Sequence, residues 1–402
     1  MNIRWSHKTF ALFLHSAIIL AISYIIVSFF ISSTKSLSFF SVIDESGDVP
    51  MSDMYLFFNS RKGPARLDTN IVLVNVDICK NRFEIAQLIE QINSLHPKVI
   101  GLDVIFRNQK NREEDMILEN AIRTCKNIVV TCVLDAEHRE SNDVYSNCSR
   151  NFFVDQRNDS ITEGFINLDS DGDSPVQTFT PKLYLQKENF WDTLYCFAAQ
   201  IVRVCDETAF QKLLQRTGNL ELINFQPLRF NQINKNDMED NPELIAGKIV
   251  LIGSFSEDLH KTPISLQMQG LEIHTQIIST ILDGKYINRL DNIWTKILNI
   301  LLCYLFTLFC WITPAKLTKG VSTLIKLAQV TILFLAFFAG YYLFNHYNID
   351  ITYARTILVM GVVTLIADIY DVGITYGSKF ITFCSKYIHT RKKIIQYEND
   401  NN

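Results

Sequence analysis

Glycine, proline and charged residues are all scarce in this chain of 402 residues. With 15 glycines and 9 prolines, the sequence is neither collagen-like nor of the low-complexity disordered kind. Charged residues make up 20% of it, below the roughly 25% of an ordinary soluble domain. The net charge of −4 provides no dominant basic face, so we expect no nucleic-acid partner.

The common catalytic motifs are missing as well. The sequence has no Gly-x-Ser-x-Gly, HExxH, GxxxxGK[ST] or GxGxxG pattern, and no clustered set of Cys and His ligands. Each of these patterns places a nucleophile, a metal ion or a phosphate group in a known local geometry. We therefore expect no catalytic residues, no bound metal and no cofactor.

Long apolar stretches, in contrast, are plentiful. A hydrocarbon core of about 30 Å is crossed by about 20 helical residues, so such stretches predict membrane-spanning helices. The first stretch is too long for a leader peptide and has no small-residue cleavage site, so we expect it to remain as an anchor. The four predicted transmembrane helices cover residues 10–31, 293–313, 327–347 and 353–375.

Basic residues near these helices fall mostly on one side of the membrane. They are Arg4 and Lys8 before the first helix, Lys316, Lys319 and Lys326 between the second and third, and five Lys or Arg residues from Lys379 to Lys393 after the fourth. Positive residues stay on the cytoplasmic side. The sequence therefore predicts a membrane protein with cytoplasmic termini, residues 1–9 and 376–402, and an outer domain over residues 32–292.

Within the outer domain, short β-branched runs alternate with helical patterns. Strand, helix, strand, helix and strand are predicted over residues 71–76, 85–95, 98–106, 118–125 and 127–133. This order is typical of parallel crossover units. Around residues 160–230 we expect an antiparallel insertion that contains a helix at 191–204. After it, a buried strand over 248–253 and a helix over 270–284 are again of the kind found in parallel crossover units. The predicted fold is an α/β domain with a mostly parallel central sheet flanked by helices, plus four transmembrane α-helices.

Six cysteines belong to the outer domain: Cys79, Cys125, Cys132, Cys148, Cys196 and Cys205. An oxidising exterior permits disulfides, and an even number favours them. Most of the six lie in apolar helix or strand patterns, where a buried free thiol is the commoner state. The sequence therefore predicts no particular pairing.

Two acidic residues, Asp77 and Asp103, lie at the ends of predicted parallel strands. The carboxyl ends of such strands border the crevice in which ligands bind, so the two carboxylates are candidates to hold a cation or an amine. The alternative is structural, since an aspartate at a strand end often caps the following helix or accepts bonds from backbone amides.

Three further candidates, Gly253, Ser254 and His274, lie at the end of the strand over 248–253 or after it. Gly253 and Ser254 begin a turn that could bind phosphate, although it matches no established phosphate motif. His274 is either a ligand-sensing imidazole or a histidine packed in the core.

A run of acids at Asp169–Asp173 resembles a calcium loop but has its glycine out of place, so a tight acidic turn is the preferred interpretation.

Asp368 and Asp371 lie three residues apart on the last predicted transmembrane helix. Acidic residues inside a membrane are candidates for a functional role, which here would be signal coupling. The alternative places both at the cytoplasmic boundary, where they would simply be solvated.

Several of these segments together resemble a CHASE2 domain, the extracytoplasmic sensory module of bacterial receptors. The similar segments are residues 71–77, 101–106, 164–168 with Asp171-Gly172, and above all LIAGKIVLIG at 244–253 followed by GLEIH at 270–274. The similarity covers about residues 35–290. One helix before the domain and three after it also match the arrangement of that family.

The resemblance implies a sensor joined to an output domain such as a nucleotide cyclase or a kinase. Only residues 376–402 follow the last predicted helix, too few for a catalytic core, so we expect the output to be a separate cytoplasmic protein. Ser174-Pro175-Val176 stand where the family tends to have an arginine, so no ligand role is carried over from that residue.

The resulting prediction is a non-enzymatic sensor that passes the signal of an unidentified extracytoplasmic ligand to a cytoplasmic partner. The resemblance implies that it lies in a bacterial inner membrane. Contact with the lipid bilayer follows from the spanning helices, and a homodimer is compatible with this role. Two alternatives stay open. The protein could be a membrane scaffold or a subunit of an envelope complex, or an extracytoplasmic enzyme that uses Asp77, Asp103 and His274.

Overall fold

The computed structural model describes residues 7–34, 51–135, 139–141, 144–154, 161–168, 174–187, 190–234, 238, 241–312 and 319–400. The chain forms two compact units. The helical unit contains Met1–Met51 and Arg289–Asn402, and the α/β unit contains Ser52–Asn288. The acidic run at Asp169–Asp173 lies outside the described residues.

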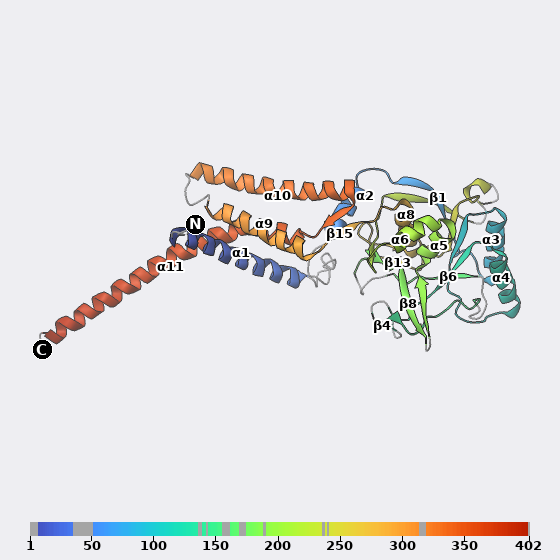
Figure 1. Ribbon diagram of the computed structural model, residues 1–402, viewed down its shortest axis with the longest axis horizontal. Helices are drawn as coiled ribbons and strands as arrows, with labels where there is room; N and C mark the ends of the chain where they lie inside the picture. Colours follow the sequence, from blue (N-terminus) through green and yellow to red (C-terminus); the bar gives the residue numbers. More distant parts are fainter. Residues whose placement is uncertain are drawn as a thin grey trace. The chain divides into compact units, whose positions relative to one another are not determined.

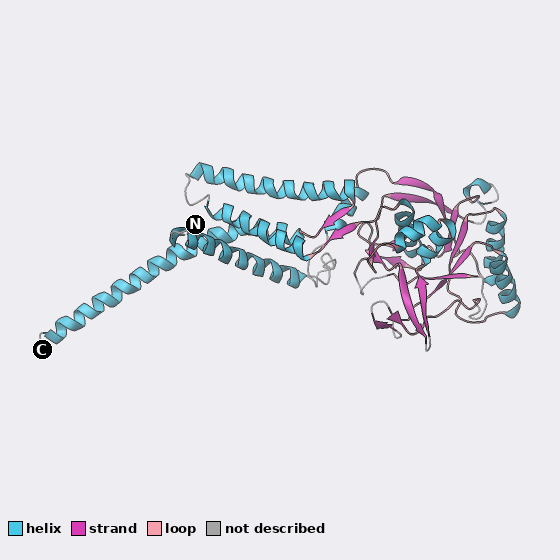
Figure 2. Cartoon of the chain, viewed as in Figure 1, coloured by secondary structure: helices cyan, strands magenta, loops and turns pink. Residues whose placement is uncertain are grey.

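The centre of the α/β unit is a parallel sheet, whose strands are among those drawn in magenta in Figure 2. The strand order is β11-β1-β12-β2-β3-β6. Every neighbouring pair in it is parallel. The strands are β1 (Arg66–Asn75), β2 (Val99–Asp103), β3 (Ile128–Cys132), β6 (Thr162–Phe165), β11 (Leu228–Ile233) and β12 (Ile249–Gly253). The predicted parallel sheet is confirmed.

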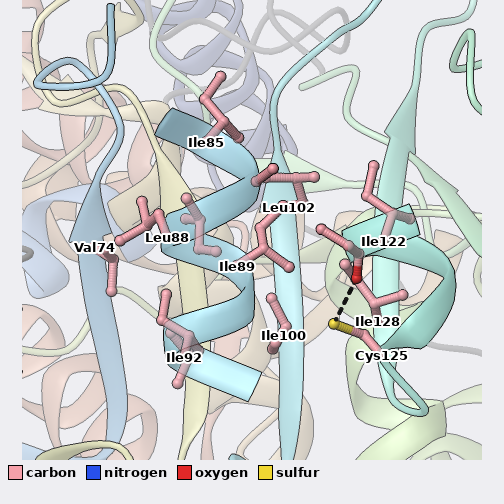
Figure 3. Packing of buried hydrophobic residues seen from close by; sticks show 14 of the residues in the cluster. Val74, Ile85, Leu88, Ile89, Ile92, Ile100, Leu102, Ile122, Cys125 and Ile128 are labelled. Carbon is pink, nitrogen blue, oxygen red and sulfur yellow. Dashed lines mark hydrogen bonds between the residues drawn. The ribbon is translucent and has the colours of Figure 1, made fainter. Parts of the chain in front are cut away.

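One face of this sheet is covered by α3 (Arg82–Ser94) and α4 (Arg112–Thr124) (Figure 3). Asn81 starts α3 by accepting a 2.9 Å hydrogen bond from the backbone N–H of Glu84. The apolar side chains of α3 recur at helical spacing and pack against the sheet, which confirms the expected amphipathic helix. They are Ile85, Leu88, Ile89 and Ile92, and they meet Val74, Ile100 and Leu102 in one buried cluster. Each such fully buried side chain contributes roughly 1.5–3 kcal/mol.

The other face is covered by α5 (Phe197–Cys205) and α8 (Gly270–Asp283), with α6 (Glu207–Leu214) packed beside both. Side chains alternate along a strand, so Ile100 and Leu102 face α3 whereas Gly101 faces α5. A Cβ atom at Gly101 would lie 2.7 Å from Ile201 Cδ1, which is closer than real contacts. Helices therefore flank the sheet on both faces, as the sequence predicts.

The predicted antiparallel insertion is present only in part. β8 (Lys182–Lys187) pairs antiparallel with β9 (Phe190–Tyr195), in a small sheet of order β4-β5-β8-β9 with β4 (Arg139–Ser141) and β5 (Val144–Tyr145). β7 (Thr178–Phe179) pairs antiparallel with β10 (Glu221–Leu222). β6 and β11, however, join the parallel sheet, at its two edges.

The helix predicted over residues 191–204 is wrong in its first part. Residues 190–195 are strand β9, and α5 begins only at Phe197 after its N-cap Cys196. Over so few residues, the apolar positions fit the period of a helix and the period of a strand equally well. Pairing with β8, which lies nearby in the chain, decides in favour of a strand.

Shorter elements complete the α/β unit. They are α2 (Met51–Ser60), the 3₁₀ helix η2 (Pro242–Leu244), and the antiparallel pair β13 (Leu259–His260) and β14 (Met268–Gln269). Helix α8 ends at Gly284, whose φ of 62° is the left-handed conformation that glycine adopts without strain. The chain then enters β15 (Asn288–Leu290), which pairs with β16 (Ile349–Ile351).

The helical unit consists of α1 (His7–Thr34), α9 (Ile293–Ile312), α10 (Lys319–Tyr347) and α11 (Ala354–Asp400) (Figure 1). Four segments in them are long and apolar enough to cross a membrane, in agreement with the four predicted: Phe10–Ser32, Ile293–Ile312, Lys326–Tyr347 and Ala354–Phe380. Leu20 and Val27 of α1 pack with Phe306 of α9 and Val359 of α11. Between these helices, His15 Nδ1 lies 2.8 Å from the hydroxyl of Tyr370.

Candidate functional site

The site is built on the carboxyl ends of three adjacent strands. In the register of the sheet, Asn75 of β1 lies opposite Gly253 of β12, and Gly253 lies opposite Asp103 of β2. Parallel strands bring their carboxyl ends to the same edge. Gly253 keeps this edge compact, because a Cβ atom there would lie 3.0 Å from Leu271 and 3.3 Å from Asp103. We call this region the strand-end site.

Asp77 follows β1 and holds the loop that leaves β12. Its Oδ2 accepts hydrogen bonds of 3.0 Å from the backbone N–H of Phe255 and from the hydroxyl of Ser256. Partial burial raises the pKa of this carboxyl, but hydrogen bonds from Ser254, Phe255 and Ser256 outweigh it and leave the pKa below its usual range. Asp77 is therefore ionised at neutral pH and ties two strand ends together.

The turn at Gly253 and Ser254 is closed by its own hydrogen bonds. Ser254 Oγ accepts bonds of 3.2 and 3.1 Å from the backbone N–H groups of Ser256 and Glu257. Together with the bond from Phe255 to Asp77, these use the donors that a phosphate group would need. In this structure the turn is occupied by protein acceptors.

Asp103 has a different environment from Asp77. Asp103 is the last residue of β2, and its side chain is partly buried. Desolvation raises its pKa to about 7, with a further contribution from the negative charge of Asp258. Asp103 therefore changes charge close to neutral pH, which makes it the most responsive carboxyl of the strand-end site.

Asp258, the residue before β13, accepts a hydrogen bond from His260 at the end of that strand, with 2.7 Å between His260 Nε2 and Asp258 Oδ1. The hydrogen bond from His260 holds the pKa of Asp258 below its usual range, and the same bond raises the pKa of His260. Asp258 also contacts the start of α8. Its backbone oxygen accepts a 2.7 Å bond from the N–H of Gly270, and a Cβ atom at Gly270 would overlap its Oδ2.

His274 lies on α8, with only 4% of its surface exposed. Its ring meets the edge of Phe197 at 5.4 Å between centroids, and its Nδ1 has no hydrogen-bond partner among the described residues. Desolvation lowers the pKa of His274 to about 4, so the imidazole is neutral at pH 7. The histidine is packed, as one interpretation of the sequence has it, yet one of its polar atoms is left unsatisfied.

The candidates divide into two groups within the strand-end site. Asp77 and Ser254 share one hydrogen-bonded loop, with Gly253 at its base, whereas Asp103 and His274 both face the charge of Asp258. No hydrogen bond among the described residues joins Asp77, Asp103 and His274. In the described part of the chain, no group of three or more His, Cys, Asp or Glu side chains is placed to hold a metal ion.

Asp258 and His260 do not appear among the sequence candidates. They lie in an irregular segment after β12, where neither strand nor helix periodicity marks a position. The available signal was weak but real. An acid and a histidine two residues apart follow the carboxyl end of a central strand, the place where loops carry function in α/β sheets.

Asp368 and Asp371 are the two acids predicted on the last spanning helix. Both lie on α11 within the candidate span Ala354–Phe380. Asp368 Oδ2 accepts a 2.8 Å bond from Lys326, the residue of α10 at which the candidate span begins, and both side chains are about half exposed. An ion pair at the end of a span favours the boundary interpretation for Asp368, since charges are costly in the bilayer centre.

These observations define a class of protein: a multi-pass membrane protein whose α/β domain lies between its first and second spanning helices. The chain belongs to the CHASE2 family, because the family model of the CHASE2 domain matches residues 39–313, more than half of the sequence. CHASE2 domains are extracytoplasmic sensory domains. The resemblance seen in the sequence is thereby confirmed. No curated protein and no solved structure matches the chain.

Proposed function

We propose that this protein is a membrane sensor that detects an extracytoplasmic ligand at the strand-end site and passes the signal to a cytoplasmic output protein. The ligand class we propose is a cation or an amine held by the carboxyl groups of Asp103 and Asp258. The protein itself performs no catalysis in this scheme. Asp77, Gly253 and Ser254 shape the loop of the site, and His274 lies buried on α8 within the field of Asp258.

The contact between Asp258 and Gly270 is the observation that carries this proposal. The carboxylate of Asp258 fills the place of a Cβ atom at Gly270, and the backbone oxygen of Asp258 accepts a 2.7 Å bond from the N–H of Gly270. We therefore expect a displacement of Asp258 to move the first turn of α8. The chain leaves α8 at Asp283 and enters α9, the second spanning helix, at Ile293. Asp258 therefore contacts the start of α8, from which the chain continues through β15 into a membrane helix.

Charge explains how a ligand could shift this arrangement. Asp103 and Asp258 repel each other when both are ionised, and this repulsion contributes to the raised pKa of Asp103. A cation or an amine between them favours the state in which both are ionised and close. A ligand shifts an equilibrium only by its different affinity for the two states, and small helix displacements are a common way to carry such a shift.

The test uses the full chain in its own host, with an affinity tag at the carboxyl terminus. After crosslinking in intact membranes, we expect the tag to capture a cytoplasmic protein with a kinase, cyclase or comparable output domain. The Asp103→Asn variant should bind this protein equally well but change its output activity several-fold. The matched control is Asp283→Asn at the far end of α8, where an exposed ion pair with Lys285 is removed and no change is expected.

Two outcomes would contradict the proposal. Capture of extracytoplasmic proteins alone would favour the envelope scaffold. An output activity that is the same in wild type, Asp103→Asn and Asp283→Asn would remove the strand-end site from signalling.

A further inference from the structure

Two cysteines that are distant in the sequence lie together in the α/β unit. Cys132 is the last residue of β3, and Cys148 follows β5. The residues directly after them, Val133 and Ser149, form an antiparallel bridge with two backbone hydrogen bonds of 3.0 and 2.8 Å. Since neighbouring side chains point to opposite faces, Cys132 and Cys148 share one face of this bridge.

The two thiols contact each other in the interior. Both residues are buried, at 0% exposure for Cys132 and 7% for Cys148, and their side chains are joined by a hydrogen bond. Cys125, also buried, differs because its Sγ lies 3.2 Å from the backbone oxygen of Ala121 in its own helix. Both are free thiols in this structure, so the Cys132–Cys148 contact places two oxidisable sulfur atoms next to each other.

The surroundings make Cys148 the more reactive of the two. The hydrogen bond from Cys132 and the positive charge of Arg150 lower the pKa of Cys148, whereas the pKa of Cys132 is raised. Arg150 is held in place by Glu163, with 3.1 Å between Arg150 Nη1 and Glu163 Oε2. The thiolate is the nucleophile in thiol–disulfide exchange, so Cys148 is placed to attack first.

We propose that Cys132 and Cys148 form a disulfide when the domain folds outside the cytoplasm. The oxidant is a disulfide-bearing thiol oxidoreductase of that compartment. The Cys148 thiolate attacks one sulfur of the enzyme's disulfide and forms a mixed disulfide, and the other enzyme sulfur leaves as a thiolate. Cys132 then loses its proton and attacks Cys148, which forms the S–S bond and releases the enzyme as a dithiol. Two electrons and two protons leave the cysteine pair.

The position of the bond gives it a structural consequence. It would link β3 of the central sheet to the segment that carries Arg150 and, through β5, to the small sheet of β4, β5, β8 and β9. A crosslink of this kind stabilises mainly by restricting the unfolded chain, and such bonds persist in oxidising compartments. The disulfide would add a covalent crosslink to the Val133–Ser149 and Phe165–Cys196 bridges that already connect these parts of the unit.

The experiment is direct mapping on the full-length protein. Membranes are quenched in acid, free thiols are blocked with N-ethylmaleimide under denaturing conditions, and the protein is digested without reductant for mass spectrometry. We expect a disulfide-linked pair of peptides containing Cys132 and Cys148, and a lower Tm after reduction. In Cys132→Ser and in Cys148→Ser the remaining cysteine should carry the maleimide, and reduction should no longer lower Tm. Cys125→Ser is the matched buried control and should behave like wild type.

Wild-type mapping decides the matter even if a serine variant fails to accumulate. The proposal is overturned if both cysteines of the wild-type protein are recovered with maleimide. It is also overturned if either is linked to a different cysteine.

Discussion

Two carboxyl groups at one sheet edge have opposite behaviour, and their surroundings explain why. Asp77 accepts hydrogen bonds from a loop and has a lowered pKa, whereas Asp103 is desolvated beside Asp258 and has a pKa of about 7. A desolvated acid favours its neutral form, while an acid with donors around it favours its charge. Two aspartates at neighbouring strand ends can thus take different roles, the first as a tie and the second as a responsive group.

We predict that Asp103→Asn stabilises the protein above neutral pH. Between about pH 4 and pH 7 the folded state keeps a proton on Asp103 that the unfolded state has lost, so stability falls as pH rises through this window. Asparagine resembles the protonated acid and removes this loss. We expect a gain of about 1–3 kcal/mol at pH 8 that shrinks to almost none at pH 4, measured by thermal unfolding in detergent.

The control for this prediction is Asp283→Asn, which changes an exposed acid on the same unit. Its effect should stay within about 0.5 kcal/mol at both pH values. Identical pH profiles for wild type and Asp103→Asn would show that Asp103 does not titrate near neutrality.

At the level of elements, the close approach of α5 to the sheet depends on glycine. A Cβ atom at Gly164 of β6 would lie 2.6 Å from the Cα and 2.9 Å from the backbone N of Phe197, where α5 begins. Backbone atoms cannot move aside as the end of a side chain can. The same helix carries the Phe197 ring that packs on His274, so its position also sets the wall of the strand-end site.

We predict that Gly164→Ala destabilises the α/β unit by about 1–3 kcal/mol, because β6 and α5 must move apart. The measurement is the Tm of the full-length protein in detergent. Gly63→Ala is the control, since a Cβ atom there meets nothing within 4 Å and should change Tm little. Equal Tm values for the two variants would mean that the contact relaxes without cost.

At the scale of the whole molecule, the membrane helices and the charges beside them determine the topology. Basic residues flank the ends of the spans at Lys8, Lys326 and Lys379, and an ion pair joins Lys326 to Asp368 of α11. Lysine and arginine are retained on the cytoplasmic side, so these ends are expected to face the cytoplasm. The α/β unit, between the first and second spans, then lies on the opposite side.

We predict that protease added to intact spheroplasts degrades the α/β unit and leaves a tag at the carboxyl terminus protected. Rupture of the spheroplasts should make the tag accessible as well, which serves as the control. A protected α/β unit, or a tag that is removed before rupture, would reverse the expected orientation.

Local patterns in the sequence were sufficient for most of the elements. The spans follow from the length of apolar stretches, and β1, β12 and α3 follow from buried runs and helical spacing, because these signals depend on neighbours in the chain. The positions of Asp77, Asp103 and Gly253 at one edge also follow, since parallel strands end together. The family could be identified from the segments at 244–253 and 270–274, because each is a continuous run of residues in the chain.

Tertiary structure alone decided the remaining contacts. The partnership of Asp258 with His260 and Gly270, the contact of Cys132 with Cys148, and the parallel pairing of β6 and β11 all join residues through strand register and loop closure. Periodicity reports which face of an element is buried but not which distant element covers it. That choice depends on the packing of the whole domain, and so do the chemical properties of its buried groups.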